Sequence, residues 1–472
     1  MDNPIEPKEK KGNKLIPIIA IVVVIVVVGS FVGLDYKNLV KTSPAPAPTT
    51  SNNVLYVYTG VSGPSNSEHL LGGCVIAEMK GGSTPAASAQ LMAYLMNPAI
   101  QKACEAHTGF IPVDQGAYTS SPSTSVPTIY SASNATVDVT YYTSISTSDE
   151  SYINGVISNF EKAYPNIQVT PSFITASSMV EEISSLVTGN SHANVVMTID
   201  NLDVGVLFYD GYLASINAAK ITAGEGVISS ISNLNNYEVQ EFGGVYFLTQ
   251  LVNIPLVWVD YTALQGAGIT KVPTTYTQLY TDAKILDKKY GVGEINMQGH
   301  GGASTPTELY QWMVQFGGNP MMFNDTGDIH AMEYIYNLSA YFSPDYKTSY
   351  WATYTGLASN SYSMMYYQWP GSVNLTKLGM KSFNSTDTVT NESLAAINGG
   401  VFLRSPVSWI GEWQTLMDKA WVSIVEDHSA YSSIPSILAS QNSALKSFLA
   451  TNYNQNVADQ YENGTYAPIE GQ

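Results

Sequence analysis

Apolar and polar residues alternate along the chain in a way that predicts strands and helices in turn from residue 137 onward. Residues 137–142 alternate with the period of two that is typical of a half-buried strand, and apolar residues recur at helical spacing from Ile153 to Tyr164. The same reasoning predicts a strand at 167–174, a helix at 179–187 and a strand at 193–199. Strands that alternate with helices imply a sheet with parallel crossovers, so we expect an α/β fold.

The second half of the chain opens with a long apolar stretch. Residues 245–259 (VYFLTQLVNIPLVWV) predict an extended segment, interrupted at Asn253 and Pro255, that we expect to cross between two lobes. Beyond it the pattern predicts helices at 275–290, 309–316, 409–424 and 436–449, and a short strand at 364–369. A chain of 472 residues is long enough for two lobes with sizeable cores.

The beginning of the chain predicts a membrane anchor. Residues 15–34 are uncharged and apolar, which is enough to span a bilayer as a helix, and four lysines precede them. By the positive-inside rule the N-terminus stays in the cytoplasm, so we expect a single-pass anchor in the cell membrane with the binding domain extracellular. Residues 35–53, rich in Pro, Ser and Thr, are interpreted as a linker. The alternatives are a pilin-like leader cut near Gly12 and a buried core helix.

Composition limits the partners that the protein can bind. Charged residues make up 12% of the chain and the formal net charge is −18, which argues against nucleic acid and against basic patches that hold anionic lipid. A surface made from Ser, Thr, Asn, Gln and Tyr stays hydrated in acid, which suits an extracellular protein of an acidophile. Sequons compatible with N-glycosylation occur at Asn134, Asn324, Asn337, Asn374, Asn384, Asn391 and Asn463.

A distinctive module lies early in the chain, at residues 70–113 (LLGGCVIAEMKGGSTPAASAQLMAYLMNPAIQKACEAHTGFIPV). It contains a Gly-Gly turn, a short apolar strand, a helix that begins at Thr84-Pro85, and a Gly-x-Ile-Pro-Val exit. Cys74 falls on the strand, and Cys104 falls near the end of the helix that packs back on it. In an oxidising compartment we expect these two cysteines to form a disulfide, and two buried free thiols are the alternative.

This module resembles a late segment of the extracellular sugar-binding proteins that serve ABC importers. From residue 137 onward the chain contains segments similar to earlier landmarks of that family: NFEKAYPNIQVT, MVQFGGNP and MMYYQWPGSVN. A later segment, FLRSPVSWIGEWQTLM, is similar to the one that follows the Gly-x-Ile-Pro-Val exit in the family. The stretch from Gly243 to Leu286 resembles the family's hinge strand and the helices after it. The landmarks therefore occur in cyclic order, as in a circularly permuted member of the family.

The resemblance implies a fold and a division of the chain. It implies an α/β, two-lobed periplasmic-binding-protein-like fold of type II, circularly permuted, with an N-terminal transmembrane helix. The anchor and the spacer resemble those of sugar-binding proteins of thermoacidophilic archaea. The expected parts are an anchor (1–34), a linker (35–53), a permuted module in lobe 1 (54–118), a second linker (119–136), lobe 1 (137–247) and lobe 2 (248–472).

Candidate ligand contacts follow from the chemistry of sugars, which offer hydroxyl groups and flat apolar faces. By resemblance Trp369 stacks on a sugar ring, and the alternative is a core or interlobe tryptophan. Asp200 and Asn201 end a buried strand, where they either bind hydroxyls or cap the next helix. The first polar loop adds three candidates that capping would also explain: Ser144, Ser146 and Glu150.

Weaker candidates complete the site. Gln250 and Asn253 are polar residues in the apolar stretch at 245–259. Gly73 is expected to allow close backbone approach or a tight turn. Trp312 and Gln315 lie on one predicted helix, where Trp312 is more typical of a core residue.

These features favour the reversible capture of a sugar, with glucose or a similar hexose favoured by the resemblance. The expected partners are the sugar, the permease subunits of an ABC transporter and the membrane. No metal-binding histidine pair or phosphate-binding glycine loop is evident, so we expect neither enzymatic activity nor a cofactor. A cell-surface glycosidase with paired carboxylates and a carbohydrate-binding surface-layer protein are the alternatives.

Overall fold

The computed structural model describes residues 54–470, except for 61–62, 66, 132, 146–148, 223–241, 349–352, 354–355, 358, 360, 369–380 and 383–387. The predicted anchor and linker, together with Ser146 and Trp369, lie outside the described residues. Among the residues that are described, no helix combines the length and apolar character that a membrane crossing requires.

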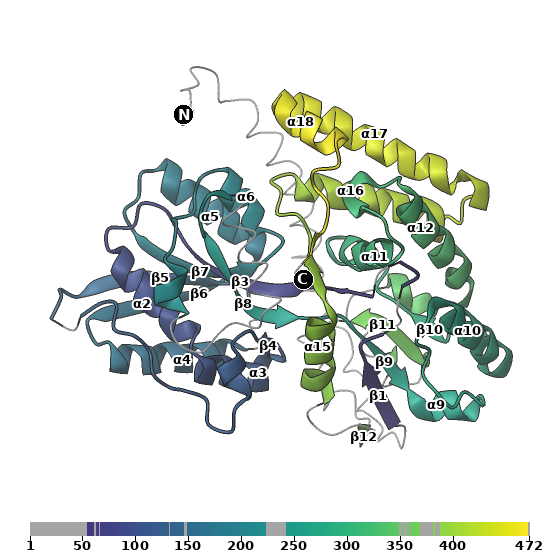
Figure 1. The fold of residues 1–472 in the computed structure, drawn as a ribbon, viewed down its shortest axis with the longest axis horizontal. Helices are drawn as coiled ribbons and strands as arrows, with labels where there is room; N and C mark the ends of the chain where they lie inside the picture. The colour runs from purple at the N-terminus through teal and green to yellow at the C-terminus, as the bar shows by residue number, and fades with distance from the viewer. Residues whose placement is uncertain are drawn as a thin grey trace.

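The described chain forms two lobes, each built on its own sheet (Figure 1). The six-stranded lobe has the strand order β4 (Ile111–Pro112), β8 (Phe247–Asn253), β3 (Gly72–Glu78), β7 (Asn194–Asp200), β5 (Val137–Thr143) and β6 (Ile167–Phe173). Its helices are α2 (Pro85–Leu95), α3 (Pro98–Thr108), α4 (Glu150–Ala163), α5 (Ala176–Thr188), α6 (Val204–Tyr209) and α7 (Ala218–Ile221).

The five-stranded lobe has the strand order β10 (Ile295–Asn296), β11 (Met364–Gln368), β9 (Leu256–Asp260), β1 (Val54–Tyr58) and β12 (Lys381–Ser382). Its helices are α9 (Tyr261–Gly266), α10 (Tyr276–Tyr290), α11 (Ser304–Gln315), α12 (Thr326–Leu338), α15 (Thr388–Gly399), α16 (Ile410–Trp421), α17 (Ile434–Asn452) and α18 (Gln455–Glu462). A third, small sheet joins β14 (Ile469–Glu470), β13 (Val401–Leu403) and β2 (His69–Leu70).

Strand pairing in the six-stranded lobe confirms one expectation about the early module. β5 runs parallel to β6 and β7, and β3 runs antiparallel to β7 and β8. The strand that carries Cys74 therefore shares a sheet with the strand that begins at Val137. β7 is buried along almost its whole length, because helices cover both faces of this sheet.

Other expectations about the early module are corrected. β1 pairs with β9 in the five-stranded lobe, so residues 54–118 are distributed over all three sheets. The single helix expected after Thr84 is divided into α2 and α3. The division falls at Asn97-Pro98, where the side chain of Asn97 accepts a hydrogen bond from the backbone N–H of Ala99 and Pro98 begins the second helix.

The long apolar stretch at 245–259 crosses between the lobes, as expected. It forms two strands: β8 belongs to the six-stranded lobe and β9 to the five-stranded lobe, with only Ile254 and Pro255 between them. The crossing is therefore short. A second connection is apolar, since residues of α15 and β13 pack in the same cluster as β8 and β9.

The predicted disulfide is wrong in this structure. Cys74 and Cys104 are both buried free thiols. The Cys104 sulfur lies 3.6 Å from Oγ1 of Thr108, one helical turn further along α3. Both thiols pack in the main apolar cluster of the six-stranded lobe, so they behave as small core side chains.

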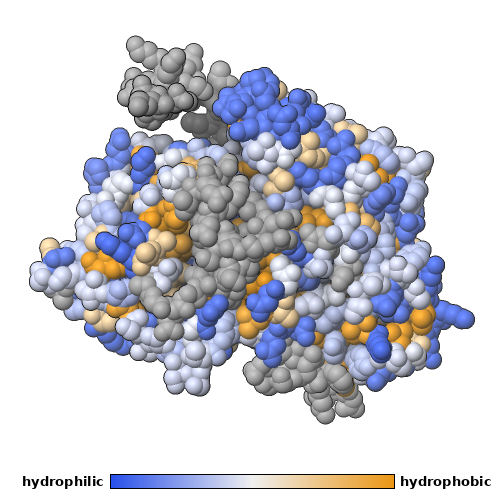
Figure 2. All heavy atoms as spheres, viewed as in Figure 1, coloured by the Kyte–Doolittle hydropathy of each residue, from blue (hydrophilic) through white to orange (hydrophobic). Residues whose placement is uncertain are grey.

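The surface agrees with the low charge of the sequence. On the face shown in Figure 2 pale colours predominate, and the apolar patches are separated from one another by more polar residues. Strongly hydrophilic residues gather over α18, whose exposed side chains include Gln455, Asn456 and Asp459.

Candidate functional site

The carboxyl end of β7 places polar side chains at the boundary between the lobes. Asp200 is the last residue of β7, and its Oδ1 accepts a hydrogen bond of 2.9 Å from the backbone N–H of Leu202. The backbone N–H of Asn201 donates to the carbonyl oxygen of Gly73 (3.0 Å), and Nδ2 of Asn201 donates to the carbonyl oxygen of Leu71 (3.0 Å). These bonds hold Asn201 against the segment that joins β2 to β3.

Arg404 approaches the same place from the other side. It is the only arginine in the sequence, it follows β13 directly, and only 8% of its surface is exposed. Its Nη1 donates to Oγ1 of Thr307 on α11 (2.5 Å), and its Nη2 donates to Oδ1 of Asn201 (3.3 Å). The guanidinium group therefore bridges the two lobes.

Two carboxyl groups lie close enough to this guanidinium to interact with it electrostatically, but neither forms an ion pair with it. Asp200 and Asp203 both interact electrostatically with Arg404, yet the ion pairs within 4.0 Å in the described part of the chain are Lys102–Glu105 and Lys446–Glu462. Burial, with the neighbouring charge of Asp200, raises the pKa of Asp203 to about 7, although Arg404 opposes the shift. Burial likewise raises the pKa of Asp200.

We call Asp200, Asn201, Asp203, Thr307 and Arg404 the interlobe cluster. It combines carboxylate and amide acceptors with amide, hydroxyl and guanidinium donors. The guanidinium carries more N–H donors than its hydrogen bonds to Thr307 and Asn201 use. An arrangement of this kind can bind a ligand that both donates and accepts hydrogen bonds.

Buried polar residues continue along α11 beside the cluster. Oε1 of Gln311 accepts from the backbone N–H of Leu70 (2.9 Å), and Oε2 of Glu308 accepts from the backbone N–H of Gln298 (2.8 Å). Burial raises the pKa of Glu308 well above its usual range. Nε2 of Gln298 is buried and has no hydrogen-bond partner among the described residues. A buried donor of this kind requires a water or a ligand.

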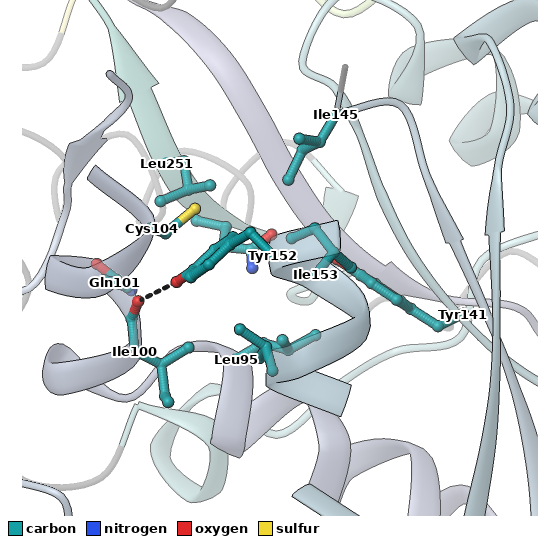
Figure 3. Close-up of a pocket in the computed structure, with 11 residues that line it drawn as sticks. Leu95, Ile100, Gln101, Cys104, Tyr141, Ile145, Tyr152, Ile153 and Leu251 are labelled. Atoms are coloured by element: carbon teal, nitrogen blue, oxygen red, sulfur yellow. Dashed lines mark hydrogen bonds between the residues drawn. The ribbon is translucent and has the colours of Figure 1, made fainter. Parts of the chain in front are cut away.

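A separate cavity lies inside the six-stranded lobe (Figure 3). It is lined by residues of α2, α3, α4, β5 and β8 and by Ile145. On its wall the hydroxyl group of Tyr152 donates to the carbonyl oxygen of Ile100 (3.4 Å). The cavity has a volume of about 20 Å³, which has room for a water but not for a sugar. This cavity is therefore not the site of a carbohydrate.

Gln250 lines this cavity rather than the interlobe cluster. Its Oε1 accepts from the hydroxyl group of Thr198 (2.8 Å), which lies 2.7 Å from the hydroxyl oxygen of Tyr141. These three side chains tie β5, β7 and β8 together inside the lobe. Asn253, at the end of β8, is also buried and lies opposite Gly72 of β3.

The remaining candidates are spread over the two lobes. The hydroxyl group of Ser144 donates to the carbonyl oxygen of Thr198 (3.3 Å), and Glu150 is exposed at the first residue of α4. Gly73 has a φ of 119°, and a side chain there would meet the carbonyl oxygen of Leu251, so the expected close backbone approach is present.

Trp312 and Gln315 lie in the core of the five-stranded lobe, where neither has exposed surface. Oε1 of Gln315 accepts from the hydroxyl groups of Tyr276 (2.5 Å) and Tyr367 (2.8 Å). The ring of Trp312 lies 4.9 Å from that of Tyr276, so both candidates belong to one buried aromatic network.

The structure brings Asp200 and Asn201 together with three residues that the sequence analysis did not single out. These are Asp203, Thr307 and Arg404. One signal was present in the sequence, because a single arginine among many lysines marks a position where a planar, forked donor is needed.

Comparisons with known proteins agree with this architecture. The MalE sugar-binding protein from Xanthomonas citri is 12% identical, with 67% of this chain and all of that chain covered at a TM-score of 0.50, so the two share a fold. The GacH receptor of Streptomyces glaucescens is 14% identical, with 68% of this chain and 100% of that chain covered at a TM-score of 0.47. A comparison with curated proteins found no match. The family model for bacterial extracellular solute-binding proteins matches residues 144–382, which is half of the chain. The chain belongs to the family of bacterial extracellular solute-binding proteins.

Proposed function

We propose that the protein captures a sugar between its lobes and delivers it, chemically unchanged, to the permease of an ABC importer. The observation that carries this proposal is the buried Arg404, which reaches both lobes and faces Asp200 and Asp203 without a direct ion pair. The proposal is supported by membership of a solute-binding family. It is also supported by the name of the structural neighbour from Xanthomonas citri, a sugar-binding protein.

The interlobe cluster suits a polyhydroxylated ligand. A sugar hydroxyl group donates one hydrogen bond and accepts others, so it can donate to the carboxylate of Asp200 while it accepts from the guanidinium of Arg404. Hydrogen bonds to charged groups each contribute about 1.5–3 kcal/mol. Closure of the lobes would remove water from these bonds and strengthen them.

The other candidates extend this proposed site. Trp369 follows β11, and we propose that it stacks on an apolar sugar face with a contribution of about 1 kcal/mol. We propose the candidates Ser144, Ser146, Glu150, Asn253 and Gly73 as contacts or supports of this site. Gln250, Gln315 and Trp312 are buried inside the lobes, so their proposed role is to support the elements behind it. A hexose such as glucose is the proposed ligand, and a small oligosaccharide is the alternative.

The proposal also covers membrane attachment, the circular permutation and glycosylation. Residues 15–34 would tether it to the membrane, with the lobes outside, as in the archaeal membrane-anchored type. The shared sheet of β3 and β5 supports a circular permutation of the family order. Glycans on the extracellular part are also proposed, and Asn134 and Asn463 are exposed sequon residues at a bend and a turn.

Calorimetric titration of the ectodomain with glucose, galactose and maltose tests the function. We expect one of these sugars to bind, and we expect Arg404→Gln to weaken that binding about tenfold or more, because charge-assisted hydrogen bonds are lost. Lys446→Gln is the matched control, since Lys446 is a partly exposed cation that pairs with Glu462 on α18. Equal affinities in the two variants would remove Arg404 from the site. Sugar hydrolysis by the unchanged protein would favour the glycosidase alternative.

A further inference from the structure

The segment after α18 returns to the junction of the lobes. In Figure 1 it runs from α18 back toward the space between them, and we call residues 465–470 the strap. Its Tyr466 ring packs edge-on against Trp409, with ring centroids 5.2 Å apart. The hydroxyl group of Ser405 donates to the carbonyl oxygen of Ala467 (2.8 Å). At its end the strap becomes β14, which pairs with β13. Three separate contacts therefore fix its course.

The strand that the strap covers is the one that leads into Arg404. β13 is three residues long, and its two edges are paired with different segments. On one edge Phe402 and Leu403 lie opposite Glu470 and Ile469 of β14. On the other edge β13 runs parallel to β2, which is joined through Leu71 to β3 of the six-stranded lobe.

We propose that the strap positions Arg404 for ligand binding, a role that rests on the proposed sugar-binding function. A strand of three residues has few backbone bonds of its own, so pairing on both edges decides how well it is ordered. Arg404 follows β13 without an intervening residue, and the neighbouring Ser405 is bonded to the strap. Without the strap one edge of β13 is unpaired, so the backbone next to Arg404 is less ordered. The guanidinium then loses more conformational freedom on binding a ligand than it does when the strap is present.

The strap also explains why Arg404 can remain aimed at the cluster without an ion pair. Its side chain has two hydrogen bonds, to Thr307 and Asn201, and it faces two carboxyl groups at longer range. A backbone fixed on both sides of the guanidinium preserves this geometry while leaving donors for the ligand. The strap is thus a positioning element, since none of its own side chains has to contact the sugar.

Truncation of the chain after Gly464 tests the proposal, with removal of residues 471 and 472 alone as the control that leaves the strap whole. Calorimetry with the tightest-binding of glucose, galactose and maltose should show an affinity loss of about tenfold for the truncation and no change for the control. Ser405→Ala, which removes one contact and keeps the full chain, should lose about two- to fivefold. This variant guards against a truncated chain that does not fold.

A double-mutant cycle distinguishes positioning from a general loss of stability. In an Arg404→Gln background the truncation should cost less than about twofold, because the group that it positions is already absent. If the truncation lowered the affinity by the same factor with Arg404→Gln as without it, the proposal would be overturned. Full affinity in the truncated chain would overturn it too.

Hydrogen exchange of the amides at 401–404 separates this proposal from the proposed function. These amides should exchange at least about tenfold faster after truncation, whether or not a sugar binds. A wild-type protein that binds none of the sugars would refute the function, while faster exchange would still support the role of the strap in ordering the strand. Unchanged exchange would refute that role by itself.

Discussion

Replacing Gly73 by alanine should destabilise the protein far more than a single methyl group normally does. Gly73 has a φ of 119°, where L side chains are strained, and a Cβ atom there would lie 2.1 Å from the carbonyl oxygen of Leu251. The backbone strain costs about 1–3 kcal/mol. Separation of β3 from β8 to relieve the clash weakens ladder hydrogen bonds that contribute about 1 kcal/mol each. We therefore expect a loss of about 3 kcal/mol in the free energy of unfolding.

The matched control is Gly155→Ala, the same chemical change on the exposed face of α4. A Cβ atom at Gly155 would meet nothing within 4 Å, and alanine stabilises a helix interior by about 0.5–1 kcal/mol relative to glycine. The two variants should thus differ by about 4 kcal/mol in the free energy of unfolding.

Thermal unfolding without ligand measures this difference, at about 2–4 °C per kcal/mol for a unit of about 150–250 residues, which is the size of one lobe. We expect Gly73→Ala to melt about 6–12 °C below the wild type and Gly155→Ala slightly above it. The reasoning is refuted if Gly73→Ala melts within about 2 °C of the wild type, since the strain and the clash at this position would then cost nothing measurable. Sugar affinity should fall too, because the carbonyl oxygen of Gly73 accepts the hydrogen bond that holds Asn201.

Two further predictions concern titratable groups. Burial raises the pKa of Glu78 and of Asp203 to about 7, so each folded-state carboxyl group binds its proton more tightly than in the unfolded chain, where its pKa is near 4. Their contribution to stability is complete below about pH 4 and is lost as the pH rises through about 7, so the melting temperature should fall between about pH 5 and pH 7.5. Burial lowers the pKa of His69 to about 4, so the contribution of His69 to stability is lost as the pH falls, which opposes this trend. A melting temperature that rises across the interval would contradict the prediction. Burial also raises the pKa values of Cys74 and Cys104, so both thiols should resist alkylation in the native protein. In denaturant without reductant two free thiols should titrate, and the absence of any titrating thiol would indicate a disulfide.

Hydrophobic periodicity located many of the regular elements, because it reports burial on one face, but it did not predict α12, α15 or α18. The helix expected at 275–290 is α10 (Tyr276–Tyr290), and the strand expected at 137–142 is β5 (Val137–Thr143). Periodicity does not report which sheet a strand joins. β1 looked like part of the early module and pairs instead with β9, whose residues lie about 200 positions later.

The site was predictable only in part for a related reason. Asp200 and Asn201 were found because a polar residue after a buried strand marks a sheet edge. Arg404 follows a three-residue strand in a segment with no clear periodicity, and its partners Asn201 and Thr307 are far away in sequence. Trp312 and Gln315 looked like ligand contacts by residue type, but their neighbours in space, which the sequence does not reveal, are core aromatic rings.

The solitary arginine gives experimenters a chemical reporter that needs no mutation. A dicarbonyl reagent that reacts with guanidinium groups has one target side chain in all 472 residues, and that target lies where the lobes meet. The speed of the labelling would measure how often the lobes separate, and protection by an added compound would identify a ligand from a mixture. Mass spectrometry of the intact protein would read both results as a single adduct.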